Sequence, residues 1–345
     1  MATYETQVEG LTQLTITSAS DPNQSELTQF LTDGARDVIN RMKIVNPSLM
    51  NLFATVTSES GSGSYIDGEI LDAWGSDGTD DHPATLVSTS EGKSSIDTDS
   101  FHYRSKYNPC YYREGKKVFV KPDGGSILHL SYPTVNFGSE SILDFPSQYE
   151  HLVVLYASVQ TLLSYMASLD GDLPTDVTLP SLPVIPSLSD NAVASLGTAP
   201  TYTPPVLSTS ISDIETQISN DDPEMADVER NKVSAQIDEY QARLTNALND
   251  FNKNNAEYQG DLQKKISDGQ LSSKDDDQKI QKYSAEVQSY SAETQALLSD
   301  FSAKINKISA KYQWATARYG ILRQQYNEAI GLLSQPKQQE QGGKH

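Results

Sequence analysis

The pattern of apolar and polar positions divides the chain into stretches of different character. Apolar residues recur at helical spacing over 25–43, alternate with polar residues in short runs over 49–135, and return to helical spacing over 146–169. A proline-rich stretch follows at 173–210, and helical spacing then continues over 211–335. The pattern predicts a mainly α fold with a small β-rich insert.

Residues 1–172 are expected to form one helical core that carries this insert. Helix 25–43 is amphipathic, with its apolar residues on one stripe. The runs in 49–135 are separated by clusters of Gly, Ser, Asp and Pro, as short strands are. Gly115 marks a tight turn between two of them, so we predict a β-hairpin there.

The most hydrophobic segment is the predicted helix at 146–169, which is apolar nearly all round. Such a helix must be buried on several sides, so we expect it to pack on helix 25–43 and on a neighbouring subunit. A membrane span needs about 20 largely apolar residues, and this segment falls short because polar residues such as His151 and Gln160 interrupt it. We predict subunit contacts, not a membrane anchor, for Tyr149, Leu152, Leu155, Tyr156, Val159 and Leu163.

The second half of the chain is expected to form a long helical hairpin. The prolines of 173–210 predict an extended, polyproline-like strap. Within 211–335, apolar residues recur about every 3.5 positions, the coiled-coil value. A polar segment at 267–277, which contains Gly269, separates two helices at 222–266 and 278–335 and predicts an antiparallel return.

The stripes of these two helices are wide and rich in tyrosine. Two helices alone cannot bury them, so we expect contacts with other chains. The predicted contact residues here are Tyr240, Phe251, Tyr312 and Tyr319. Residues 336–345 form a polar tail that ends the helix after Pro336.

Charge and cysteine content narrow the function classes. The 345 residues include 46 acidic and 26 basic side chains, for a net charge of −20. Binding through phosphate neutralisation needs a basic footprint, so the balance argues against a nucleic-acid-binding protein, although DNA could pass such a surface without sticking. A single cysteine, Cys110, excludes an intramolecular disulfide and a cysteine-rich zinc site. With no basic, apolar leader at the N-terminus, we expect a soluble, intracellular chain.

Catalytic and ligand-binding patterns are weak. Cys110 could act as a nucleophile with His102 or His129, but a strand position is the favoured interpretation. The acidic segments 77–82 and 274–277 could hold calcium, but they lack the spacing of an EF-hand loop, so solvated loops are favoured. We therefore predict no enzyme activity, no catalytic residue, no metal and no cofactor.

The order of a helix, a β-rich insert and the helix YEHLVVLYASVQTLLSYM resembles the core of head-to-tail adaptor, or connector, proteins of tailed bacteriophages over residues 25–170. The segment that begins DDPEMADVERNKVSAQIDEYQARL looks like virion structural proteins of marine phages, over 173–335. The resemblance implies a ring of about a dozen copies below the portal protein. That ring would contact tail or neck proteins in the virion and extend the DNA channel, after assembly in the host cytoplasm.

Two other function classes stay open at the level of sequence. An elongated trimeric fibre, or a fibre-attachment or collar protein, would place the Tyr and Leu stripe around a three-fold coiled coil. An enzyme ranks well behind both.

Overall fold

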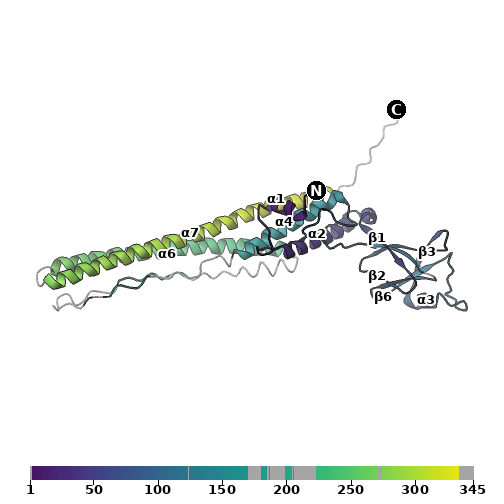
Figure 1. The fold of residues 1–345 in the computed structure, drawn as a ribbon, viewed down its shortest axis with the longest axis horizontal. Helices are drawn as coiled ribbons and strands as arrows, with labels where there is room; N and C mark the ends of the chain where they lie inside the picture. Colours follow the sequence, from purple (N-terminus) through teal and green to yellow (C-terminus); the bar gives the residue numbers. More distant parts are fainter. Residues whose placement is uncertain are drawn as a thin grey trace, which may run out of the picture. The chain divides into compact units, whose positions relative to one another are not determined.

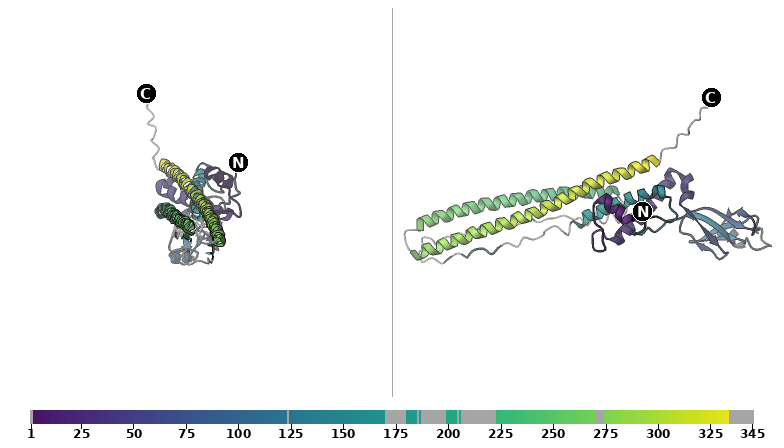
Figure 2. Two further views of the ribbon diagram at one scale, coloured as in Figure 1. Left: turned by 90° about the vertical axis from the view of Figure 1, so that its left-hand side faces the viewer. Right: turned by 45° about the horizontal axis from the view of Figure 1, so that its top comes forward.

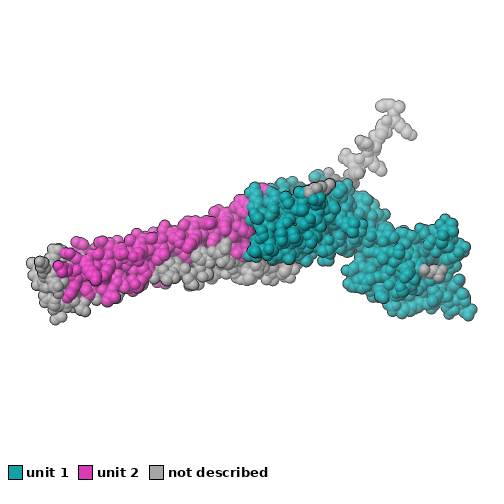
Figure 3. Space-filling view, viewed as in Figure 1, with its two compact units in different colours: residues 1–161, 319–345 teal, residues 162–318 magenta. Residues whose placement is uncertain are grey.

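The chain is mainly helical and carries a small β insert, which confirms this coarse part of the predicted fold class (Figure 1). It divides into two compact units, coloured in Figure 3: unit 1 comprises residues 1–161 and 319–345, and unit 2 comprises residues 162–318. Most of the predicted strap and all of the predicted polar tail lie outside the described residues. This computed structural model describes residues 2–122, 124–169, 180–184, 186, 199–203, 205, 223–269 and 274–333.

Unit 1 begins with two helices. Helix α1 (Tyr4–Thr12) is capped by Thr3, whose hydroxyl accepts a hydrogen bond from the backbone N–H of Thr6. Helix α2 (Gln24–Val45) starts with a capping box formed by Asn23 and Glu26 and covers the predicted 25–43. A 3₁₀ helix, η1 (Pro47–Phe53), leads into the insert.

The β insert contains two four-stranded sheets, and most of its neighbouring strands pair antiparallel. Strands β6 (Cys110–Glu114) and β7 (Lys117–Lys121) form a hairpin that turns at Gly115, whose φ of 61° is in the left-handed region that favours glycine, as the sequence predicts. Short helix α3 (Thr89–Ser94) precedes β6. The first sheet has the order β1 (Ala54–Glu59), β8 (Gly125–Leu130), β3 (Ile70–Ser76) and β4 (Asp81–Pro83), and the second has the order β2 (Ser64–Tyr65), β7 (Lys117–Lys121), β6 (Cys110–Glu114) and β5 (Thr85–Leu86).

A buried carboxylate connects the two sheets of the insert. Glu59, at the end of β1, is only 4% exposed, and its two oxygens accept hydrogen bonds from the backbone N–H groups of Gly63 and Val120, at 2.6 and 2.9 Å. A buried charge is tolerated only with such partners. The small core beneath it consists of Ile66, Ala73, Val118, Val120 and Ile127.

Helix α4 (Ser147–Ser168) is the centre of the larger core of unit 1. Its residues Leu152, Val153 and Ala157 are fully buried, which is what an apolar helix with no polar face requires. The partners come from α1, α2, η1 and β8, and from the far end of the chain: Tyr4, Val8, Leu27, Leu31, Ala35, Val38, Ile39, Met42, Met50, Phe53, Leu130 and Tyr326.

Unit 2 contains helix α6 (Pro223–Gly269) and most of helix α7 (Lys274–Leu333), which lie side by side in both Figure 1 and Figure 2. Hydrogen bonds join Asn255 to Ser291, Tyr258 to Tyr283 and Gln295 to Asn252. Residue numbers rise along α6 as they fall along α7, so the helices run antiparallel where these bonds form. Helix α6 ends at Gly269, where the sequence predicts the break.

We predict that Leu152→Ala lowers the free energy of unfolding of unit 1 by about 2–5 kcal/mol, because it leaves a cavity at a fully buried position. Leu155→Ala, on the next turn of the same helix, is the matched control. It should cost roughly 1 kcal/mol, because Leu155 is only half-buried. Chemical denaturation measures both values. Equal losses would contradict this packing of α4.

Candidate subunit interface

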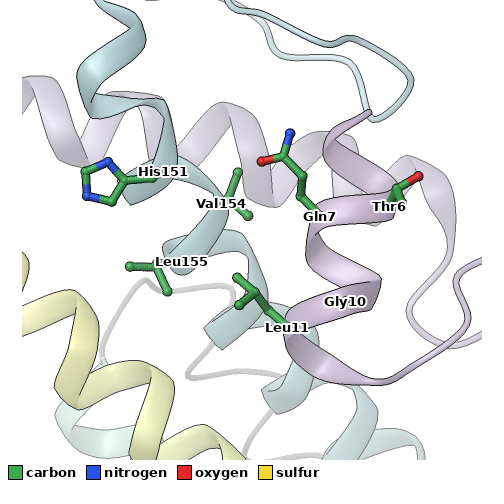
Figure 4. Close-up of a pocket in the computed structure, with 7 residues that line it drawn as sticks. All are labelled: Thr6, Gln7, Gly10, Leu11, His151, Val154 and Leu155. Atoms are coloured by element: carbon green, nitrogen blue, oxygen red, sulfur yellow. The ribbon is translucent and has the colours of Figure 1, made fainter. Parts of the chain in front are cut away.

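Helices α1 and α4 form an open, mostly apolar groove on unit 1 with a volume of about 530 Å³. Figure 4 shows the two helices beside one another, with the side chains of Val154 and Leu11 on their facing sides. The amide of Gln7 is turned back onto its own helix, where it donates a 2.8 Å hydrogen bond to the carbonyl of Ala2. The lining residues are Thr6, Gln7, Gly10 and Leu11 from α1 and His151, Val154 and Leu155 from α4.

Gly10 leaves the backbone of α1 bare at this groove. Glycine inside a helix costs about 0.5–1 kcal/mol relative to alanine, so it normally serves a close contact or an unusual backbone angle. Within the part of the chain that the structure describes neither applies, because nothing packs within 4 Å of the position where a Cβ would stand and Gly10 has no positive φ. Among the described residues, none packs against α1 at Gly10.

A second feature of unit 1 fixes the end of α7 to the core. The hydroxyl of Tyr326 donates a short hydrogen bond to Oδ2 of Asp37, and Nε of Arg41 donates to the same oxygen at 2.7 Å. The guanidinium of Arg41 lies 5.5 Å from the centroid of the Tyr326 ring, and the ring of Tyr156 meets Tyr326 edge-on at 5.9 Å. We call Asp37, Arg41, Tyr156 and Tyr326 the tyrosine clasp.

The clasp holds Tyr326 in its neutral form. Burial is the main reason that the pKa of Tyr326 lies far above its usual value of about 10, and the negative charge of Asp37 raises it further. A phenolate would lose its hydrogen bond to Asp37 and face a carboxylate of like charge. The contact therefore depends on the phenol proton.

The predicted contact residues of α4 mostly serve the chain's own core. Leu152 is fully buried, Val159 is 8% exposed, and Tyr156 belongs to the clasp. Tyr149 is 7% exposed and stacks on Phe53, with ring centroids 5.6 Å apart. Leu155 differs because it is half-buried and lines the groove.

The other predicted contact residues are also buried within the chain. In unit 2, Leu163 and Tyr312 are each 1% exposed, Tyr240 is 4% exposed, and Phe251 meets the ring of Tyr202 edge-on at 6.1 Å. Tyr319 belongs to unit 1 and is 1% exposed. The ten residues thus do not form one surface, and their role between subunits stays a prediction.

The cysteine and the histidines considered for catalysis are not brought together. Cys110 is fully buried in β6, and burial raises the pKa of its thiol, which disfavours the reactive thiolate. The ring of His129 is held by Thr57 at 2.9 Å and by the carbonyl of Leu130 at 3.0 Å. His102 is exposed beside Phe101. The strand interpretation of Cys110 is confirmed.

In the acidic loop at 77–82, the carboxylate of Asp77 accepts hydrogen bonds from the loop itself. Oδ1 of Asp77 accepts hydrogen bonds from the backbone N–H groups of Thr79 and Asp80, and Oδ2 lies 3.3 Å from Nε2 of His82. The N–H groups of Asp80 and Thr79, followed by His82, lower the pKa of Asp77 to about 2. No cluster of potential metal ligands occurs among the described residues. The side chains of 274–277 lie outside them.

Comparisons with known proteins identify no relative. No model of a known protein family matches the chain, and no curated protein matches it. In the ranges that the structure covers, no helix combines the length and apolar character needed to cross a membrane.

Sequence patterns missed the groove because they missed α1. The helix has only nine residues, too few for a clear periodicity, and Gly10 lowers its helical propensity. A signal was present in the capping residue Thr3 and in the spacing of Tyr4, Val8 and Leu11.

We predict that Tyr326→Phe destabilises unit 1 by about 1.5–3 kcal/mol, because the Asp37 carboxylate, a charged acceptor, loses the hydrogen bond that the Tyr326 hydroxyl donates. The folded pKa of Tyr326 is raised, so its contribution is complete below pH 10 and is lost as the pH rises beyond that value. Unfolding of both proteins at pH 7 to 11 tests this. The difference between them should shrink above pH 10, and a difference that does not depend on pH would contradict the clasp.

We predict that Asp77→Ala destabilises the β insert at neutral pH, because two backbone N–H groups lose their acceptor. The folded pKa of Asp77 is lowered, so its contribution is present above pH 4 and is lost as the pH falls through 2. Thermal unfolding should therefore show a gap between wild type and variant that closes between pH 4 and 2. Asp77→Asn keeps an acceptor oxygen and should show a smaller gap at neutral pH.

Proposed function

We propose that this protein is a structural component of the head-to-tail connector of a tailed-phage virion. It forms a ring below the portal protein, extends the DNA channel and joins the capsid to tail or neck proteins. Its role is assembly, with no catalytic step and no cofactor.

The observation that carries the proposal is the order and packing of the elements of unit 1. An amphipathic helix (α2), a β insert and an apolar helix (α4) follow one another in the order that the resemblance to connector proteins implies. Both helices belong to one core, and α4 borders an open, mostly apolar groove on its surface. An apolar groove at the surface suits a protein that acts by contact with other proteins.

The charge of the chain agrees with a channel that DNA crosses. A net charge of −20 gives the molecule the same sign as the phosphate backbone. Neutralised phosphates supply most of the affinity in non-specific DNA binding, so a surface of this charge does not retain DNA in transit.

Helices α6 and α7 are proposed to form a coiled-coil-like hairpin that packs against neighbouring subunits or other neck proteins. Apolar side chains remain partly open on α7, including Leu297 at 39% and Trp314 at 37% exposure. The buried pair Asn255 and Ser291 supports one register, because a polar contact inside an apolar seam is lost when the helices slide.

The fibre hypothesis predicts a different arrangement of the same helices. Three parallel copies would bury the stripe around a three-fold axis. The hydrogen bonds from α6 to α7 use part of that stripe within one chain, which supports the hairpin.

We predict that the purified full-length chain forms closed rings of a single size in negative-stain images and that its mass by light scattering is a fixed multiple of 37.9 kDa. Antibodies to the chain should label the head-to-tail junction of virions that contain it. Three-copy rods, or label along the fibres, would overturn the connector in favour of the fibre. The ring should also bind a DNA duplex no more tightly in low salt than in high salt.

A further inference from the structure

The seam between α6 and α7 contains polar side chains that are buried inside unit 2. The amide of Asn255 donates a hydrogen bond to the hydroxyl of Ser291, and both residues are only 5% exposed. Thr294, one turn further along α7, is fully buried, and no described residue bonds its hydroxyl. We call Asn255, Ser291 and Thr294 the polar layer.

Large apolar side chains surround the polar layer along the seam. Phe251 precedes it on α6, Val287 and Leu298 flank it on α7, and each of the three is at most 3% exposed. Replacing a buried hydrogen-bonded pair by apolar groups of the same shape is often neutral or stabilising, and a buried hydroxyl without a partner is a cost. Stability alone therefore does not account for the layer.

The polar layer and a neighbouring tyrosine pair fit one alignment of the two helices. The hydroxyls of Tyr258 and Tyr283 lie 2.8 Å apart. A slide of seven residues keeps two heptad seams in contact, but in one direction it places Asn255 opposite the buried Leu298. In the other direction it moves Tyr258 beyond Tyr283, the first tyrosine of α7.

Parallel pairing loses the bond of the polar layer as well. Parallel copies of one helix bring equal residues to the same level, whereas Asn255 and Ser291 are 36 residues apart in the sequence. Each slide of seven residues also displaces the outward face of α6 by about 10 Å relative to that of α7. A partner that contacts both helices therefore needs a single register.

We propose that the polar layer determines the specificity of assembly, because it holds α6 and α7 in one antiparallel register and disfavours slid and parallel pairings. A buried polar residue in an apolar helix seam is known to specify register at a cost in stability. This inference rests on the proposed function, since it names the residues that fix the hairpin with which the neck partners pack.

The first experiment asks whether the polar layer serves stability, by following the loss of helical circular dichroism on heating. Ser291→Ala alone leaves the Asn255 amide without its acceptor and should lower the melting temperature by about 2–4 °C. The layer-free variant, which combines Asn255→Leu, Ser291→Ala and Thr294→Val, should melt no lower than wild type. A layer-free variant that melts below Ser291→Ala would show that the layer only stabilises the seam, and would overturn the proposal.

The second experiment measures the register in the full-length chain with cysteine pairs and a short bismaleimide cross-linker. Asn252→Cys with Gln295→Cys reports the native register, because these side chains are hydrogen-bonded at 3.3 Å. Asn252→Cys with Ser302→Cys reports a slide of seven residues. The native Cys110 is buried, so it does not compete.

The yield of each link within one chain is read by intact mass. In the layer-free variant the ratio of the slid link to the native link should rise about tenfold, because the slid register no longer buries an unpaired amide. The control Ile305→Leu changes a seam residue that is 1% exposed without changing its polarity, and it should leave the ratio at the wild-type value.

The outcomes separate this inference from the proposed function. A layer-free chain that keeps the wild-type ratio overturns the role of the polar layer and leaves the connector standing. A wild-type chain that gives the native link but forms no rings overturns the connector and leaves the role of the layer standing. A wild-type chain without the native link overturns the hairpin and this inference together.

Discussion

The burial of α4 is the constraint on which unit 1 depends. Leu152, Val153 and Val154 point in different directions around this helix, and each is at most 3% exposed. No single neighbour can cover a helix that is apolar all round. The chain meets the requirement by packing α1, α2, η1 and the last turns of α7 around it, so segments from Tyr4 to Tyr326 share one core.

Local patterns predicted the elements with strong periodicity. Helices α2 and α4 and the Gly115 hairpin are encoded by nearby residues, through a capping box, an apolar run and a glycine with positive φ. The return of α7 to unit 1 was not predictable in this way. Tyr326 follows the same helical stripe as Tyr319, and only the three-dimensional position of Asp37 distinguishes its role.

The same limit explains the outcome for the predicted contact residues. Apolar spacing shows that a side chain is buried, but it does not show which surface buries it. Nine of the ten predicted residues are covered by their own chain, whereas Leu155 lies on the wall of a groove. The groove is identified by Gly10, against which no described residue packs, and by a short helix opposite α4, and neither belongs to an apolar stripe.

The tyrosine clasp joins residues 289 positions apart, so its contacts must outweigh the entropic cost of bringing such distant residues together. Closing a flexible loop costs about 0.6 kcal/mol for each doubling of its length, so an eightfold longer connection adds only about 2 kcal/mol. A hydrogen bond to a charged acceptor contributes about 1.5–3 kcal/mol, and burial of the Tyr326 ring adds to it. Because the connection includes two helices, its real closure cost is below that of a flexible chain. The long return is therefore compatible with a stable core. Because Tyr326 packs on Tyr156 of α4, the side of α4 that borders the groove keeps its full packing only when α7 extends to Tyr326.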